Sequence, residues 1–315
     1  MAHKSYIIAG PTASGKSDFA HKLAKRTNGV IINCDSVQIY KGIENISASP
    51  FADVVCKANN LNDLGHGVGP HDDNDIKNSI IDGVPYKLFS ILPLTEQISV
   101  ADYLEMARKE YDKAIASGQT PIFVGGSGYY IGVLLNGISP IPEISQENRD
   151  RAREMVRDFP DAVRQLLPED FKMTDPQRTA RALEVFLETG RPLSEWQSLP
   201  RRGAINPKPF KIFINPHREI LNNRISMRIP LMLKGGAMDE ARSVIKSGWD
   251  ETRAIGASQL CKFIRGEISE AECNQNWITR TSQYAKRQRT WFRGQYGADV
   301  EILRVPTDAD LESIL

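Results

Sequence analysis

Cysteine is scarce in this sequence, and its four copies are far apart. The residues Cys34, Cys56, Cys261 and Cys273 form no C-x-x-C pair and have no regular spacing. This cysteine usage favours a reduced, cytoplasmic protein over a disulfide-bonded secreted one. Long hydrophobic runs are missing as well, since no apolar stretch approaches the roughly 20 residues of a membrane-spanning helix. We therefore expect a soluble protein without a membrane partner.

The sequence also lacks an excess of charge of either sign. Its 40 Lys and Arg residues against 39 Asp and Glu residues leave a net charge of +1 at pH 7. The global charge therefore predicts no partner, and any contact with nucleic acid must come from local clusters of basic residues. Internal repeats and low-complexity tails are absent too. The 315 residues suffice for one to three domains, and we expect a monomer.

Short apolar runs alternate with helical patterns along much of the chain. A helix is expected at about 16–27, and buried strands are expected at 5–9, 29–35, 120–126, 208–216 and 300–305. Strands that are separated by helices predict a parallel sheet with helices on both faces. The expected fold class is therefore α/β.

Two stretches interrupt this alternation. Residues 52–85 are polar and glycine-rich, which predicts an exposed insertion. His66 and His71 lie there among aspartates, but this context does not indicate a structural metal site. Residues 139–203 have only helical patterns, so we expect an α/β core formed by 1–138 and 204–315 with an inserted all-helical domain at 139–203.

The segment 174–192 in the expected helical domain carries signals for both ends of a helix. Asp175 can cap the first turn, and Pro176 suits the first helical position. Gly190, followed by Pro192, ends the pattern. A single well-defined helix is predicted.

The segment GPTASGKS at residues 10–17 fits the pattern G-x-x-x-x-G-K-[ST] between an expected strand and an expected helix. Its glycines allow backbone N–H groups to converge on an anion, and the helix adds its positive end. Lys16 supplies a charge for the terminal phosphate, and Ser17 supplies a hydroxyl for Mg²⁺. The pattern predicts phosphate binding without identifying the phosphate.

One feature of nucleotide-hydrolysing P-loop proteins is missing. Such proteins usually have an aspartate that ends a second strand and holds Mg²⁺ through water, but the strand at 120–126 ends in glycines. Asp35 ends the strand at 29–35 instead, and it lies beside the phosphate loop if the two strands are neighbours. It is either a plain strand-end residue, an indirect metal ligand, or a general base that faces whatever approaches the phosphates.

The stretch 274–298 near the C-terminus contains five basic residues, five aromatic residues and no acidic residue. Lys286, Arg289 and Arg293 share one helical face. A solvated helix face above an aromatic core explains part of this pattern. RNA explains it better, because charges meet phosphates and flat rings stack on unpaired bases.

A second basic pair precedes this stretch. Arg224 and Arg228 lie four residues apart, which puts them either on an exposed helix face or against a phosphoryl group. Pro230 is expected to interrupt their helix.

Six motifs in order connect these observations. They are GPTASGKS (10–17), DSVQIYKG (35–42), FVGGSGYY (123–130), DPQRTARALEVFLETGRPLSEW (175–196), RISMR (224–228) and AKRQRTWFR (285–293). The series covers most of the chain, and it resembles the tRNA dimethylallyltransferases, also called tRNA isopentenyltransferases. The resemblance implies a P-loop α/β core with an inserted helical tRNA-binding domain. It also implies transfer of a dimethylallyl group from dimethylallyl diphosphate to N6 of the adenine on the 3′ side of the anticodon in tRNA.

The resemblance further implies roles for individual residues. The catalytic residues are Asp35, which accepts the proton of N6, and Thr12 and Arg228, which stabilise the leaving group. The diphosphate site consists of Gly10, Pro11, Thr12, Ala13, Ser14, Gly15, Lys16, Ser17 and Arg228, with Mg²⁺ on Ser17. The residues expected to contact the tRNA anticodon stem-loop are Asp35, Ser36, Val37, Gln38, Ser127, Gln177, Arg178, Thr179, Ala180, Arg181, Lys286, Arg287, Gln288, Arg289, Thr290, Trp291, Phe292 and Arg293.

Two other functions remain open at this point. A P-loop kinase of a small molecule, or another NTPase, would bind and turn over ATP at the same loop. A non-catalytic RNA-binding protein with a degenerate phosphate loop would not have kept Lys16, Ser17 and Asp35 together.

Overall fold

The structure is a computed structural model that describes residues 5–52, 79–205 and 209–315. The chain divides into two compact units, one formed by residues 1–135 with 205–315 and the other by residues 136–204. Most of the expected insertion, with His66 and His71, lies outside the described residues.

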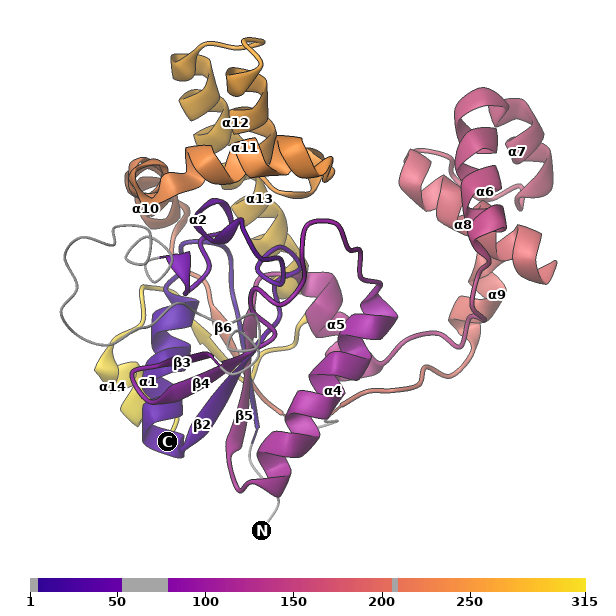
Figure 1. The fold of residues 1–315 in the computed structure, drawn as a ribbon. Helices are drawn as coiled ribbons and strands as arrows, with labels where there is room; N and C mark the ends of the chain where they lie inside the picture. The colour runs from indigo at the N-terminus through magenta and orange to yellow at the C-terminus, as the bar shows by residue number, and fades with distance from the viewer. Residues whose placement is uncertain (1–4, 53–78, 206–208) are drawn as a thin grey trace. The chain divides into compact units, whose positions relative to one another are not determined.

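The larger unit is built on a seven-stranded sheet with the order β3-β4-β2-β5-β1-β6-β7 (Figure 1). Its strands are β1 (Tyr6–Ala9), β2 (Gly29–Asn33), β3 (Ser79–Ile81), β4 (Val84–Lys87), β5 (Thr120–Gly125), β6 (Phe210–Ile214) and β7 (Val300–Ile302). The edge pair β3–β4 is antiparallel, and the other described pairs are parallel. The expected α/β class with a mainly parallel sheet is confirmed.

Helices cover both faces of this sheet. On one face, α1 (Lys16–Thr27) contributes Phe19 and Leu23 to a core with Ile8 and Ile31, and α14 (Asp308–Glu312) joins the same core. Strand side chains alternate between faces, so the neighbouring positions point the other way. There α4 (Val100–Ala116) packs beside α5 (Gly128–Asn136), and Phe292 of α13 (Glu270–Gln295) packs against Phe213 with the two rings tilted by 44°.

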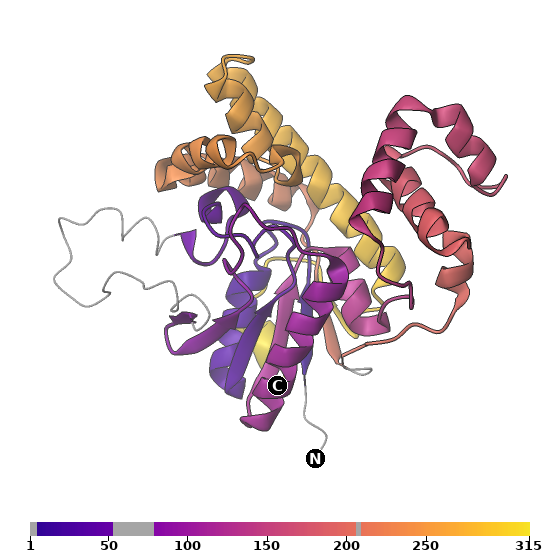
Figure 2. The same ribbon diagram turned by 45° about the vertical axis from the view of Figure 1, so that its right-hand side comes forward.

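A layer of helices lies beyond the carboxyl ends of the strands (Figure 1). It contains α2 (Glu44–Ser47), α10 (Arg218–Met232), α11 (Met238–Ser247) and α12 (Ala257–Ile264), with a kink at Leu233–Ala237, where Gly236 has a φ of 107°, and a 3-10 turn at Glu251–Arg253. Figure 2 shows α13 running from this layer down to the side of the sheet where α5 lies. This long helix therefore connects the helical layer to the carboxyl ends of the central strands.

The helix α10 continues through Pro230, which corrects the expected interruption. A proline inside a helix removes one backbone N–H donor. The N–H of Leu233 still reaches the carbonyls of Ile229 and Pro230, so the turn that contains Pro230 closes. Arg224 and Arg228 consequently stand on one continuous helix.

A β-hairpin formed by β3 and β4 occupies the end of the expected insertion; residues 79–83 are exposed or partly exposed there, and Val84 is buried. Asp82 and Gly83 connect the two strands, with φ angles of 47° and 81°. Two consecutive residues with positive φ are typical of the tight turns that join antiparallel strands. The Asp-Gly pair was the sequence signal for this hairpin.

The smaller unit contains α6 (Gln146–Asp158), α7 (Pro160–Leu166), α8 (Pro176–Thr189) and α9 (Leu193–Ser198). Ala152, Val163 and Leu183 form its own buried core. The predicted helix in this unit is confirmed: the side chain of Asp175 accepts a hydrogen bond from the N–H of Arg178 at 2.8 Å, and Gly190 ends the helix with a φ of 68°.

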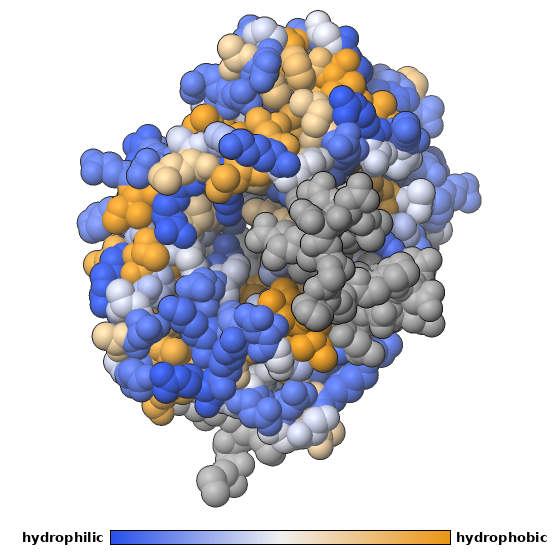
Figure 3. Space-filling model, turned by 60° about the vertical axis from the view of Figure 1, so that its left-hand side comes forward, coloured by the Kyte–Doolittle hydropathy of each residue, from blue (hydrophilic) through white to orange (hydrophobic). Residues whose placement is uncertain are grey.

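The surface is mixed in polarity. In the described part of the chain, every helix is too short or too polar to cross a bilayer. Figure 3 shows one face, on which hydrophilic side chains surround scattered hydrophobic patches.

Candidate active site at the phosphate loop

The loop at residues 10–15 joins the end of β1 to the first residue of α1. Gly15 caps α1 with a φ of 92°, a conformation that favours glycine. Ser14 is buried, and its hydroxyl has no hydrogen-bond partner within the described residues. A buried polar atom without a partner costs free energy. The loop therefore has the chemistry of an anion site that a ligand completes.

Lys16 stands at the first position of α1. Its Nζ donates to the carbonyl of Pro11 at 3.3 Å. Burial lowers the pKa of Lys16 to about 8; the negative charge of Asp35 opposes this shift, and the positive charge of Arg228 adds to it. The ammonium group thus lacks a full counter-charge, which a diphosphate would supply.

Two arginines of α10 reach the same loop from a distant part of the chain. Arg228 Nη2 donates to Thr12 Oγ1 at 2.6 Å, across 216 positions of sequence. Arg224 Nε donates to the carbonyl of Ala13 at 2.8 Å. Burial lowers the pKa of Arg228 to about 10, with a further contribution from Arg224, and the group remains cationic near neutral pH. The loop therefore has two largely buried cations, Lys16 and Arg228, together with the exposed Arg224.

Asp35 follows β2 in a turn that its own carboxylate stabilises. Its Oδ1 accepts from the N–H of Val37 at 3.0 Å and from that of Gln38 at 3.4 Å. The side chain of Asn33 holds the backbone of Asp35. Its Oδ1 accepts the N–H of Asp35 at 2.8 Å, and its Nδ2 donates to the carbonyl of Asp35 at 2.9 Å. The orientation of the carboxylate is therefore set before any substrate arrives.

The strands β1 and β2, whose adjacency was the stated condition for placing Asp35 beside the phosphate loop, are separated by β5. Asp35 nevertheless acts on Lys16 electrostatically. The intervening strand ends at Gly125, where a Cβ atom would lie 2.2 Å from the Cys34 carbonyl oxygen. The glycines at this end of β5 thus allow the turn that carries Asp35 to pack closely against it.

Hydrogen bonds also hold the residues after Asp35 that are expected to contact tRNA. Ser36 donates its N–H to Ser127 Oγ at 3.0 Å, and the two hydroxyl oxygens are 3.2 Å apart. Gln38 donates its side-chain amide to the carbonyls of Ser47 and Ala48 at 3.1 Å. Ser127 is largely buried, so its main observed role is to fix the turn at Ser36.

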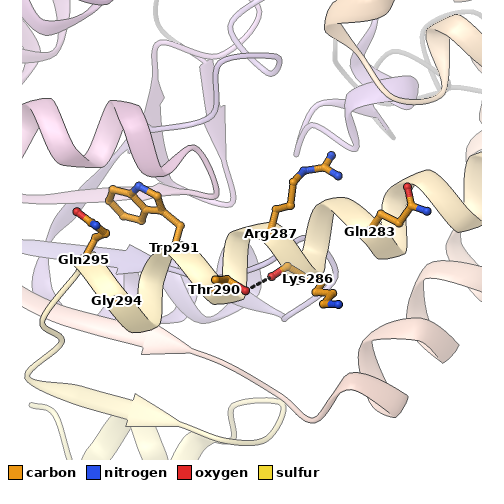
Figure 4. A pocket seen from close by; sticks show the side chains of 7 residues that line it. All are labelled: Gln283, Lys286, Arg287, Thr290, Trp291, Gly294 and Gln295. Atoms are coloured by element: carbon orange, nitrogen blue, oxygen red, sulfur yellow. Dashed lines mark hydrogen bonds between the residues drawn. The ribbon is translucent and has the colours of Figure 1, made fainter. Parts of the chain in front are cut away.

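A hollow runs along one side of α13 (Figure 4). It is lined by Gln283, Lys286, Arg287, Thr290, Trp291, Gly294 and Gln295. Lys286 and Arg287 are exposed, and the ring of Trp291 packs on α5, where a Cβ atom at Gly128 would lie 2.5 Å from it. Two cations beside a flat ring fit the phosphates and bases of a nucleic acid.

Three of the residues expected to contact tRNA on α13 have other partners. Phe292 is 2% exposed in the core and Gln288 is 5% exposed, so neither side chain is accessible to RNA. Arg289 Nε donates to Asn215 Oδ1 at 2.6 Å and thereby joins α13 to the end of β6. Of the other expected residues, Lys286, Arg287, Thr290 and Arg293 are exposed.

In the helical unit, too, some of the residues expected to contact tRNA are exposed and others are buried. Gln177 and Arg178 are exposed at the start of α8. Thr179 and Ala180 are buried, and the Thr179 hydroxyl donates to the Asp175 carbonyl at 2.9 Å. Arg181 is partly exposed and pairs with Glu184 at 3.1 Å.

No group of three or more His, Cys, Asp or Glu side chains across residues 5–52, 79–205 and 209–315 could hold a metal ion. Ser17 is exposed at the start of α1 and offers a single hydroxyl. Mg²⁺ usually keeps several waters and binds through one or two protein oxygens together with phosphates of the substrate. The residues present fit an ion of that kind, held mainly by a diphosphate.

Comparisons with known proteins identify the family of the chain. The model of the IPP transferase family matches residues 74–295, and that of the isopentenyl transferases matches residues 3–61. The tRNA dimethylallyltransferase of Zymomonas mobilis is 36% identical over 99% of this chain and 94% of its own, and that of Rickettsia bellii is 34% identical over 92% and 87%.

A solved structure gives the same result. The crystal structure of the tRNA delta(2)-isopentenylpyrophosphate transferase from Staphylococcus epidermidis has a TM-score of 0.63 and 26% identity, with 99% of this chain and 97% of that chain covered. On these matches, the chain belongs to the IPP transferase family, the family of the tRNA dimethylallyltransferases.

Proposed function

We propose that this enzyme transfers the dimethylallyl group of dimethylallyl diphosphate to N6 of the adenine on the 3′ side of the anticodon in tRNA. The observation that carries the proposal is the meeting of Lys16, Thr12 and Arg228 at one anion site with Asp35 beside it. Family membership supports prenyl transfer to tRNA and favours neither a kinase nor a non-catalytic RNA-binding protein.

The reaction requires stabilisation of a leaving group. The bond between the allylic carbon and the diphosphate oxygen breaks, and its electron pair leaves with the diphosphate. Negative charge then grows on oxygens that the backbone of the loop, Lys16 and Arg228 can neutralise. The Thr12 hydroxyl, which accepts from Arg228 at 2.6 Å, can donate its own proton to the same oxygens.

The reaction also requires a base. The exocyclic amine of adenine is a poor nucleophile because its lone pair is delocalised into the ring. As N6 bonds to the allylic carbon, the Asp35 carboxylate accepts the proton that N6 loses. Its Oδ1 is used by the turn, and among the described residues no donor binds its Oδ2, which is therefore available for this role.

Mg²⁺ is part of the proposal. Ser17 and the two phosphates of the substrate would hold the ion, which supplies positive charge to the diphosphate. The protein's own residues also orient the substrate, because Arg228 is hydrogen-bonded to the Thr12 hydroxyl and Arg224 to the carbonyl of Ala13.

Binding of the tRNA is assigned to exposed residues in each unit. We propose Lys286, Arg287, Trp291 and Arg293 of α13, and Gln177, Arg178 and Arg181 of the helical unit. Their exposed or partly exposed side chains support this assignment. Cys34, Cys261 and Cys273 are free thiols, which supports a cytoplasmic location.

The experiment is incubation of the protein with dimethylallyl diphosphate, Mg²⁺ and an unmodified tRNA that carries this adenine. Mass spectrometry of nuclease fragments should detect one added dimethylallyl group on the fragment that contains it. A tRNA with guanine at this position is the matched control and should stay unchanged. ATP hydrolysis without transfer to RNA would contradict the proposal and favour an NTPase.

A further inference from the structure

Gln288 is a polar residue on the buried side of α13. It is 5% exposed, although Lys286 and Arg287 on the same turn of the helix are exposed. A buried amide is costly unless both its oxygen and its nitrogen are hydrogen-bonded. Its partners therefore indicate why a glutamine stands there.

Both ends of the Gln288 amide are bonded to the active site. Oε1 accepts the backbone N–H of Thr12 at 2.9 Å, across 276 positions of sequence. Nε2 donates to the carbonyl of Gly126 at 2.8 Å. Since the N–H of Thr12 is a donor and the carbonyl of Gly126, just after β5, is an acceptor, only a side chain with both functions satisfies the pair.

The lack of a side chain at Gly126 leaves room for this contact. A Cβ atom at that position would lie 2.2 Å from Gln288 Nε2, so any other residue would displace the amide. Thr12 in turn is held by two distant helices, through its N–H by Gln288 on α13 and through its hydroxyl by Arg228 on α10. The position of Thr12 depends on both.

We propose that Gln288 is a positioning residue, which fixes the Thr12 segment of the phosphate loop to the helix whose other side carries Lys286, Arg287 and Trp291. This inference rests on the proposed function, because the exposed side of α13 is there assigned to tRNA. Gln288 itself contacts neither substrate. It keeps the diphosphate loop and the RNA-binding helix in one fixed geometry.

The first test compares Gln288→Leu with the wild type in the transfer assay. Loss of both hydrogen bonds leaves two buried polar atoms without partners, so kcat/KM for dimethylallyl diphosphate should fall about 10- to 100-fold. The affinity for inorganic pyrophosphate, measured by calorimetry, should fall with it. The Kd for tRNA should stay within about twofold, since exposed cations dominate that affinity.

The second test uses Gln288→Glu and the pH. As a carboxylate, the new side chain still accepts the N–H of Thr12 but repels the Gly126 carbonyl; once protonated, it can donate to that carbonyl again. The rate relative to wild type should therefore rise about 10-fold from about pH 8 to about pH 6. Asp35, Lys16 and Tyr284 lie near this site in both proteins, so the ratio to wild type isolates the effect of the new side chain. A purely structural role would give no such recovery.

The control is Gln275→Ala, a glutamine that is exposed on the same helix and donates its side-chain amide to Thr279, and it should behave as wild type. A loss of tRNA affinity in Gln288→Leu with unchanged diphosphate parameters would overturn the inference, because Gln288 would then contact RNA. Unchanged kinetics in both Gln288 variants would overturn it too. If Gln288→Leu does not fold, the pH profile of Gln288→Glu decides. Failure of the wild type to transfer would instead contradict the proposed function.

Discussion

The phosphate loop and the exposed side of α13 belong to the same unit but are built in opposite ways. At the loop, Thr12 is held at 2.6 Å by Arg228 and at 2.9 Å by Gln288, both from distant helices. On α13, Lys286 and Arg287 project from the helix beside a hollow (Figure 4). Chemistry requires atoms in fixed positions, whereas attraction of a polyanion requires accessible charge. Substitutions should therefore change the rate of transfer in the first region and the affinity for tRNA in the second.

The largest effect is expected for Asp35→Asn. The amide oxygen can still accept the N–H of Val37, so the turn should persist while the base is lost. Single-turnover transfer should slow by about 10²- to 10⁴-fold, the usual contribution of a general base. The Kd for tRNA, measured by filter binding, should not change. A parallel loss of affinity would assign Asp35 to RNA binding rather than to catalysis.

The next largest effect is expected for Arg228→Gln, which removes a cation from the leaving-group site. We expect kcat to fall about 10²-fold, because charge on the departing diphosphate is less well stabilised. Inhibition by pyrophosphate should weaken as well. Met227→Gln is a suitable control, since Met227 is 65% exposed on the same turn of α10. An equal loss in the control would show that α10 matters only through its packing.

A smaller, pH-dependent effect is expected at Lys16. Because burial lowers its pKa to about 8, the ammonium loses its proton as the pH rises through that value. Pyrophosphate affinity should therefore be constant below about pH 7 and fall by up to about 10-fold per pH unit above about pH 8. Lys16→Arg, whose side chain keeps its charge, should bind with little pH dependence. An identical profile in both proteins would assign the titration to another group.

The smallest effect is expected for Arg287→Ala on the exposed side of α13. Loss of one phosphate contact should raise the Kd for tRNA by about 3- to 10-fold and reduce the slope of log K against log salt by about 1. Lys109→Ala, which removes an exposed lysine paired with Glu105 on α4, should leave both quantities unchanged. Unchanged affinity and slope in the Arg287 variant would remove α13 from the RNA-binding surface.

Local signals in the sequence predicted much of this fold. The phosphate loop and the helix capped by Asp175 follow from glycines, prolines and caps within short segments. The Asp82-Gly83 turn was an equally local signal, and it was missed inside a polar stretch. The position of β5 between β1 and β2 could not be read from the sequence, because strand order depends on contacts between distant segments.

The two sides of α13 illustrate the same limit at the site. A buried stripe at helical spacing runs through Trp277, Thr281, Ala285, Gln288 and Phe292. This spacing was visible in the sequence and would have predicted that Gln288 points inward. Its partners Thr12 and Gly126 could not have been predicted, because they come from segments 276 and 162 positions away.

The most direct test measures the single-turnover rate of transfer at saturating tRNA, side by side for the wild type, Asp35→Asn and Arg287→Ala. If the loop performs the chemistry and α13 supplies affinity, saturation should restore the rate of Arg287→Ala to that of the wild type. The Asp35→Asn rate should stay about 10²- to 10⁴-fold lower at any tRNA concentration. Recovery of Asp35→Asn at high tRNA, or a persistent defect in Arg287→Ala, would contradict this division between the two regions.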